Sequence, residues 1–340
     1  MKSVVTFGEL MLKLSPPGYG RFVQSSQFNV EYSGAEANVA VSLCNFGITS
    51  KFVSALPKHE LGDTAVNALR RFGVDISNIV RRDKRIGIYF AEKGSSQRPS
   101  KVIYDRADTA ISNVKPTDFD WDAILEGVDW FHFTGITPAL SDSLADICLE
   151  ACKIAKEKGI TVSCDLNYRK KLWSRERANE VMSQLCQYVD VCIANEEDAG
   201  DVFGIYAENS DAIKGMVDEL SYNAVAKQLQ SKFGFRLVAI TLRESMSASD
   251  NNWSAILYDG DNIYNSRKYA VHLVDRIGGG DSFSAGLIYG CLNGYDKQKT
   301  LDFAVAASCL KQTIEGDFNM VSVEEVENLM NGNVSGRITR

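Results

Sequence analysis

Residues 128–165, VDWFHFTGITPALSDSLADICLEACKIAKEKGITVSCD, contain two apolar runs on either side of a helical pattern. The runs at 128–134 and 160–165 are short and largely apolar, which is typical of buried strands. Between them, 141–158 has apolar residues at helical spacing and ends before Gly159, a suitable helix C-cap. A strand, a helix and a second strand in this order predict a βαβ unit with parallel strands.

The same alternation continues in both directions along the chain. Further strands are predicted at 3–7, 51–56, 189–194 and 237–242. Further helices are predicted at 35–46, 63–72, 175–188, 222–233, 281–292, 297–314 and 322–330. Strands separated by helices of about 10–15 residues predict an α/β fold of three layers, α/β/α, around a mostly parallel sheet.

Two regions lack the helices of this pattern. Short alternating runs at 28–32 and 86–106 read as strands without helices between them. We expect them to form a small antiparallel β lid, made by about 14–33 and 85–107, over the strand ends. The lid would be an insertion into a single domain that spans 1–340.

Composition excludes several classes of function. The chain has 340 residues, a formal net charge of −7 and 45% hydrophobic residues. A chain with this negative net charge is not expected to have the basic surface of a general nucleic-acid binder. No apolar run approaches the roughly 18 residues of a membrane helix. The N-terminal MKSVVTFGE is too short, and too soon charged, for a signal peptide. Eight cysteines without a CxxC pair fit a reducing compartment, so we expect a cytoplasmic protein.

A run of three glycines precedes the predicted helix at 281–292, in DRIGGGDSFSAGL at 275–287. A helix N-terminus offers unpaired N–H groups, and glycines let the backbone approach a phosphate closely. The candidates for an anion hole are Gly278, Gly279 and Gly280. Asp281 is the candidate base for an attacking hydroxyl. The alternative is a glycine-rich turn in which Asp281 only caps the helix.

A second glycine opens the predicted helix at 35–46, in SGAEANVAV at 33–41. Asn38 in its first turn can offer both a donor and an acceptor to a polyol. The alternative is an ordinary helix start with polar residues on the surface.

Together, these two segments resemble those of the ribokinase-like, PfkB-type family of carbohydrate kinases. That family has a glycine-rich helix start early in the chain and a D-x-x-G-A-G-D motif late, matched by SGAEANVAVSLCNFG and DRIGGGD. Ser33 and Gly279 depart from the family pattern, but both are small. The resemblance implies a ribokinase-like fold, ATP and Mg²⁺ as cofactors, and Asp281 as catalytic base. It also places Gly34, Ala35 and Asn38 against the substrate.

Within that family the chain is most similar to the 2-keto-3-deoxygluconate kinases. VIYDR at 102–106 resembles their Tyr-x-Arg strand, and DLNYR at 165–169 resembles their D-x-N-x-R loop. The resemblance implies that Arg106 and Arg169 meet the carboxylate of a sugar acid, since a guanidinium is a planar, bidentate donor. The further substrate contacts that it implies are Tyr89, Tyr104, Asp281 and Asp317.

The resemblance also implies contacts to ATP. The residues are Asn167, Arg169, Asn195, Thr241, Arg243, Gly278, Gly280 and Ala307. Asp198 stands where the family has the Glu of an N-x-x-E motif, so a part in placing Mg²⁺ is open, and Arg243 stands where the family has a small residue. Asp275 lies where relatives hold a monovalent cation, for which K⁺ is the candidate.

These residues predict ATP-dependent phosphorylation of the terminal hydroxyl of a sugar acid. The favoured substrate is 2-keto-3-deoxygluconate and the product 2-keto-3-deoxy-6-phosphogluconate. Two alternatives stay open: a kinase of a neutral sugar such as fructose or ribose, and a non-catalytic sugar or nucleotide sensor on the same fold. We expect no nucleic-acid or membrane partner, and a homo-oligomer formed through the lid, where Ile88, Phe90 and Ile103 are apolar.

Overall fold

Ten strands join one central sheet in a computed structural model that describes residues 2–208 and 219–333. The order across the sheet is β13-β12-β11-β10-β9-β8-β1-β4-β5, and β14 pairs with β12. The strands are β1 Ser3–Phe7, β4 Thr49–Pro57, β5 Ile79–Arg82, β8 Trp130–Thr134, β9 Thr161–Asp165, β10 Val191–Ala194, β11 Leu237–Ser245, β12 Asp250–Tyr258, β13 Ile263–Asn265 and β14 Tyr269–His272.

The pairings from β5 to β11 are all parallel, which confirms the predicted mostly parallel sheet. The strands β12, β13 and β14 add an antiparallel edge that the sequence did not predict. β5 was also missed. Its residues are all half-buried, so its sequence IVRR lacks the apolar run of a central strand.

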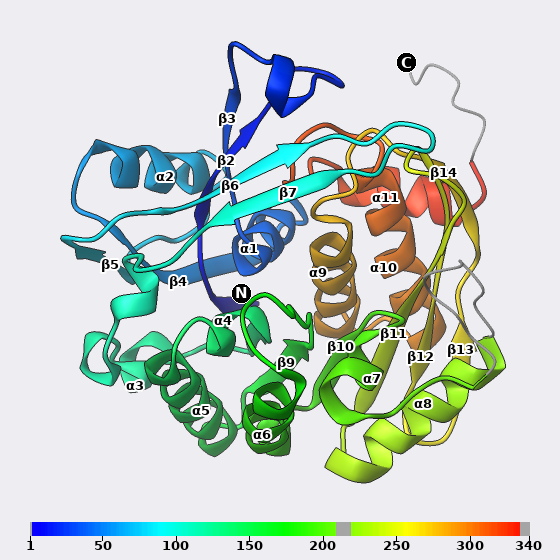
Figure 1. Ribbon diagram of the computed structural model, residues 1–340. Helices are drawn as coiled ribbons and strands as arrows, with labels where there is room; N and C mark the ends of the chain where they lie inside the picture. The colour runs from blue at the N-terminus through cyan, green and yellow to red at the C-terminus, as the bar shows by residue number, and fades with distance from the viewer. Residues whose placement is uncertain (1, 209–218, 334–340) are drawn as a thin grey trace.

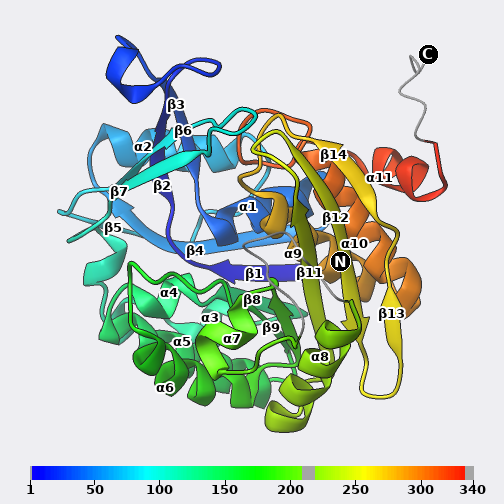
Figure 2. The ribbon, with the colours of Figure 1, turned by 45° about the vertical axis from the view of Figure 1, so that its right-hand side comes forward.

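Helices cover both faces of the sheet (Figures 1 and 2). They are α1 Ala35–Asn45, α2 Glu60–Arg70, α3 Trp121–Ile124, α4 Ile136–Ala139, α5 Asp142–Glu157, α6 Arg175–Leu185, α7 Asp198–Phe203, α8 Glu219–Phe233, α9 Gly279–Leu292, α10 Lys297–Lys311 and α11 Val323–Met330. Short 3₁₀ turns lie at Phe22–Gln24, Ile111–Asn113, Pro116–Asp118 and Cys186–Tyr188. None of the helices in the described ranges is long and apolar enough to cross a membrane.

Alternation along β1 shows how the sheet divides the core. Val5 and Phe7 pack in a cluster with α5, α6 and α8, whereas Val4 packs in a second cluster with α1, α9 and α10. Successive side chains of a strand point to opposite faces, so a strand covered on both sides must be apolar throughout. This is why the central strands could be recognised as unbroken apolar runs.

A separate sheet of four strands forms the lid. Its order is β3-β2-β6-β7, from β3 Asn29–Ser33, β2 Met11–Ser15, β6 Gly87–Glu92 and β7 Lys101–Asp105. The outer pairings are antiparallel, and β2 and β6 run parallel in the middle. The sheet includes β2 from Met11 onward, which lies before the start at about 14 that the sequence indicated. In Figure 1 the cyan strands β6 and β7 cross above α1 and α9.

Candidate active site

A cavity of about 320 Å³ lies between the lid and the carboxyl ends of β9, β10 and β11. In an open α/β sheet, ligands bind at this end of the strands. Most of the residues that the sequence singled out line this cavity. They are Gly34, Ala35, Asn38, Tyr89, Tyr104, Arg106, Asn167, Arg169, Asn195, Thr241, Arg243, Gly278, Gly279, Gly280 and Asp281.

The three glycines lead directly into α9. Gly278 is the N-cap, with φ +82°, and a Cβ there would lie 2.1 Å from the carbonyl oxygen of Asp317, so only glycine fits. Gly280 differs, because no atom lies within 4 Å of the place its Cβ would take. The helix therefore presents its first N–H groups to the cavity, as an anion hole requires.

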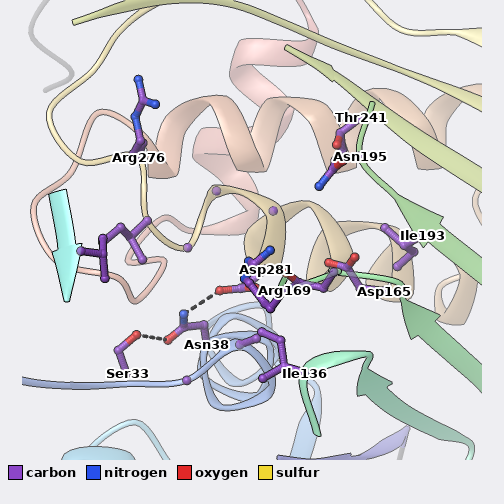
Figure 3. A pocket seen from close by; sticks show the side chains of 18 of the residues that line it. Ser33, Asn38, Ile136, Asp165, Arg169, Ile193, Asn195, Thr241, Arg276 and Asp281 are labelled. Atoms are coloured by element: carbon purple, nitrogen blue, oxygen red, sulfur yellow. Dashed lines mark hydrogen bonds between the residues drawn. The ribbon is translucent and has the colours of Figure 1, made fainter. Parts of the chain in front are cut away.

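Asp281 lies in the first turn of α9 and faces Asn38 of α1 (Figure 3). The Nδ2 of Asn38 donates a hydrogen bond to Oδ2 of Asp281 at 2.6 Å. Burial raises the pKa of Asp281 to about 6, while the bond from Asn38 opposes the rise. A carboxylate with this pKa is ionised near neutrality and is a better proton acceptor than an exposed aspartate.

Asn38 is held in place by the start of α1. A Cβ at Gly34 would lie 1.9 Å from the carbonyl oxygen of Glu9, so the glycine permits a close approach of α1 to the segment after β1. Ser33 donates to Oδ1 of Asn38 at 3.4 Å. The amide is thereby oriented with its nitrogen toward Asp281.

Asp317 lies beside the cavity and not in its lining. It accepts hydrogen bonds from Ser33 Oγ at 2.5 Å, from the hydroxyl of Tyr89 and from Lys13 Nζ. Burial and the Asp317 carboxylate together raise the pKa of the Tyr89 phenol. The residue therefore connects the lid strands β2 and β6 to the loop after α10, and we see no direct approach of its carboxylate to the cavity.

Arg106 lines the cavity and pairs with a residue that the sequence had not marked. Its Nε donates to Oε2 of Glu9 at 2.9 Å, and only 9% of the Arg106 side chain and 3% of the Glu9 side chain are exposed. Burial raises the pKa of Glu9, whereas the charge of Arg106 opposes the rise. Glu9 follows β1 in the Phe7-Gly8-Glu9 sequence, so a polar residue directly after a buried strand was the available signal. Glu9 fixes the guanidinium at the cavity wall.

Arg169 and Asp165 reach the cavity from the end of β9. The guanidinium of Arg169 donates to the carbonyl of Tyr168 at 3.0 Å. Burial raises the pKa of Asp165 well above its usual value, and the charges of Asp198 and Asp281 raise it further. Figure 3 shows Asp165, Arg169 and Asp281 close together on one side of the cavity. Asp165 was part of the D-x-N-x-R match but had no assigned role.

The opposite part of the cavity is formed by the ends of β10 and β11. Asn195 and Thr241 lie there, apart from Asp281 in Figure 3. Arg243 Nη2 pairs with Oε1 of Glu196 at 3.0 Å. Ala307 does not reach the cavity, because it is fully buried in the core cluster of α9 and α10.

Asp198 also lies away from the cavity. Its Oδ1 accepts from the N–H of Tyr168 and its Oδ2 from the N–H of Asn195, both at 2.9 Å. The carboxylate therefore fastens the loops after β9 and β10 to one another. No group of three or more His, Cys, Asp or Glu side chains gathers as a metal site within residues 2–208 and 219–333.

Known proteins share this architecture. The pfkB family of carbohydrate kinases matches residues 1–322. The 2-dehydro-3-deoxygalactonokinase of Haloferax volcanii is 34% identical over 333 residues, 98% of each chain. The 2-dehydro-3-deoxygluconokinase of Bacillus subtilis is 26% identical over 323 residues, 94% of this chain and 93% of its own. Both relatives are matched along nearly their whole length.

The crystal structure of 2-dehydro-3-deoxygluconokinase from Thermotoga maritima is similar as well. It is 52% identical, with a TM-score of 0.94, and the match covers 98% of this chain and 100% of that one. The resemblance drawn from the glycine motifs is confirmed, as are the predicted fold class and the carbohydrate kinase assignment. The chain belongs to the pfkB family of carbohydrate kinases.

Proposed function

We propose that this kinase phosphorylates the terminal hydroxyl of 2-keto-3-deoxygluconate, also called 2-dehydro-3-deoxygluconate, with ATP as donor. The observation that carries the proposal is that Arg106 and Arg169 line the same cavity as Asp281. Two guanidinium groups suit a carboxylate, whereas a neutral sugar needs neither. The names of the relatives from Thermotoga maritima and Bacillus subtilis agree with a sugar acid.

The proposed reaction is an in-line phosphoryl transfer. Arg106 and Arg169 bind the carboxylate, and Asn38 binds a hydroxyl of the sugar chain. Asp281 accepts the proton of the terminal hydroxyl of the sugar. At the same time the hydroxyl oxygen bonds to the γ-phosphorus of ATP, and the bond between that phosphorus and the bridging oxygen of the leaving ADP breaks. The N–H groups at Gly278, Gly279 and Gly280 stabilise the charge on the transferring phosphoryl.

Mg²⁺ would neutralise phosphate charge when it is bound with ATP. It is usually held by one or two carboxylates together with phosphate oxygens and waters. The carboxylates of Asp165 and Glu196 line the cavity and fit this donor set. Asp198, whose oxygens accept two backbone N–H groups, would act by fixing the loop of Asn195.

An assay of ADP release tests the proposal. Purified protein with Mg-ATP should release ADP in proportion to added 2-keto-3-deoxygluconate, and should release little with fructose or ribose. Equal release with and without the sugar acid would reject the substrate. If Mg-ATP binds but the sugar acid is not turned over, a different sugar is the substrate.

The C4 epimer, 2-keto-3-deoxygalactonate, is a second candidate substrate. The relative from Haloferax volcanii carries that substrate in its name. The two epimers share the carboxylate and the terminal hydroxyl and differ at one intermediate carbon. A comparison of kcat/KM for the two, in parallel assays, decides between them.

We also propose that the lid mediates a homo-oligomer. Val30 and Ile103 of the lid strands are exposed, with exposed fractions of 62% and 44%, and so is Val23 in the turn between β2 and β3, at 91%. Ile103 is paired with Phe90, so both point to the same face. Ile103→Asp should lower the mass measured by light scattering, whereas a wild-type monomer at all concentrations would reject the proposal.

All eight cysteines are free thiols, which fits the reducing environment of the cytoplasm.

A further inference from the structure

Two buried lysines contact Asp275, at the start of the segment that leads into α9. Lys311, the last residue of α10, is fully buried, and its Nζ donates to the carbonyl oxygen of Asp275 at 3.1 Å. A Cβ at Gly278 would lie 3.3 Å from Cε of Lys311. The end of this side chain is therefore in contact with the backbone that begins α9.

Lys13, on β2 of the lid, is the second. Its Nζ lies 2.5 Å from Oδ1 of Asp317, 2.9 Å from Oε2 of Glu31 and 3.6 Å from Oδ2 of Asp275. Burial lowers the pKa of Lys13, but the three carboxylates together raise it more, so that the net direction is upward. Lys13 is a stable buried cation.

These contacts bear on the monovalent cation expected at Asp275. The carbonyl of Asp275 accepts from Lys311, and its carboxylate faces Lys13. A K⁺ ion needs several such oxygens at once, and it would enter beside two ammonium groups that repel it. Because Lys311 and Lys13 already occupy the oxygens of Asp275, this site does not fit a monovalent cation.

We propose that Lys311 and Lys13 take the place of a monovalent cation in this kinase. Lys311 is the positioning residue, because its Nζ holds the Asp275 carbonyl. Burial lowers the pKa of Lys311, whereas the charges of Asp275 and Asp317 oppose the fall. In its ammonium form the side chain places a positive charge behind Gly278. That charge stabilises the ionised form of Asp281 and the phosphoryl group at the start of α9. The proposal rests on the kinase reaction proposed above, and it predicts turnover without added K⁺.

Replacing the salt tests the wild-type enzyme first. Activity is measured in tetramethylammonium buffer and again after KCl, NaCl or NH₄Cl replaces that salt at constant ionic strength. The expected kcat/KM is the same in every salt. A rise of about tenfold or more on adding K⁺, equal to about 1.4 kcal/mol, would overturn the proposal.

Two variants of Lys311 then separate charge from packing. Lys311→Met keeps most of the length of the side chain and removes the charge, and kcat should fall by about 10- to 100-fold. The acid limb of the pH profile should also move to higher pH, because the Lys311 charge lowers the pKa of Asp281. Lys311→Ala leaves room beside the Asp275 carbonyl, so NH₄⁺ or K⁺ should partly restore its activity. A Lys311→Met enzyme with wild-type kcat and an unmoved acid limb would overturn the proposal.

Controls keep the outcomes distinct. Lys297→Ala, at the other end of α10, should leave kcat and the salt response unchanged, and thermal melting shows whether each variant folds. If the wild type binds Mg-ATP but does not turn over the sugar acid, the proposed substrate fails. The salt dependence of Mg-ATP binding, measured by calorimetry, then tests the cation inference separately.

Discussion

The two halves of the active-site cavity are built differently. On the sugar side, side chains from distant segments bond to one another: Asn38 to Asp281, Tyr89 to Asp317 and Arg106 to Glu9. On the nucleotide side, the wall follows the ends of β10 and β11. There the Asp198 carboxylate joins the loops after β9 and β10 by accepting hydrogen bonds from the backbone N–H groups of Tyr168 and Asn195. The groups that we propose to bind the sugar are thus fixed by side-chain pairs, whereas the wall that we propose for the nucleotide is fixed by the sheet.

This difference predicts unequal sensitivity to substitution. Removing one partner of a buried charged pair costs much stability, because the charge of the other partner is left buried without a counter-charge. More than a third of the Arg243 side chain is exposed, so solvent screens its pair with the buried Glu196 and its removal should cost less. Changes on the sugar side should therefore act on kcat and specificity, and changes on the nucleotide side on the KM for ATP.

The largest effect is expected from Asp281→Asn. The amide cannot accept the proton of the attacking hydroxyl, so kcat should fall by about 10³-fold. Calorimetry should show retained Mg-ATP binding. Asp146→Asn, an exposed change on α5, is the matched control and should leave kcat unchanged. Wild-type turnover by the Asp281→Asn enzyme would show that the sugar side does not contain the base.

Arg106→Leu should come next, with a loss of about 10- to 100-fold in kcat/KM for the sugar acid. The same variant should lose little of any residual activity with fructose. Because Arg106→Leu leaves Glu9 buried without its partner, the double variant Glu9→Leu, Arg106→Leu controls for stability. It should recover the melting temperature but not the sugar-acid activity. Recovery of both would mean that Arg106 only supports the fold.

A smaller effect should appear in the pH profile. The base works when ionised and the pKa of Asp281 is about 6, so kcat/KM should rise with pH through about 6 and level off above it. Asn38→Ala removes a bond that lowers this pKa, so the rising limb should move to higher pH. A limb at the same pH in both enzymes would assign it to another group.

The smallest effect should follow Arg243→Ala on the nucleotide side. An ion pair with one half-exposed partner contributes about 0–1 kcal/mol, so the KM for ATP should rise by less than about fivefold at constant kcat. Steady-state kinetics with varied ATP provide the measurement. A fall in kcat as large as that of Arg106→Leu would show that the sugar side and the nucleotide side of the cavity are equally sensitive to substitution.

The sequence predicted the parallel core because its strands are unbroken apolar runs. It did not predict β12, whose first residues Asp250, Asn251 and Asn252 are polar. At the site, Asp281 and the glycines were found through local motifs. Lys13, Glu9 and Lys311 were missed because each acts through a distant partner, as with Lys13 and Asp317, which are 304 positions apart. No local pattern records such a pair.

Glu36 illustrates the same limit. It appeared as a polar residue in the first turn of a helix, where a surface position was the ordinary expectation. It is buried, and its Oε1 accepts from Thr134 Oγ1 and Thr137 Oγ1, both at 2.7 Å. Burial raises its pKa to about 7. The pattern marked a helix start correctly but could not tell a structural carboxylate from an exposed one.

The contrast between Gly278 and Gly280 is useful for protein engineering. Any side chain at 278 collides with the backbone of Asp317, so that position cannot be varied without refolding the loop. A methyl group at 280 meets no protein atom and occupies cavity volume instead. Gly280→Ala should therefore fold normally while its methyl group narrows the proposed phosphate site, which makes it a useful negative control for ligand screens and a first position at which to select for modified nucleotides.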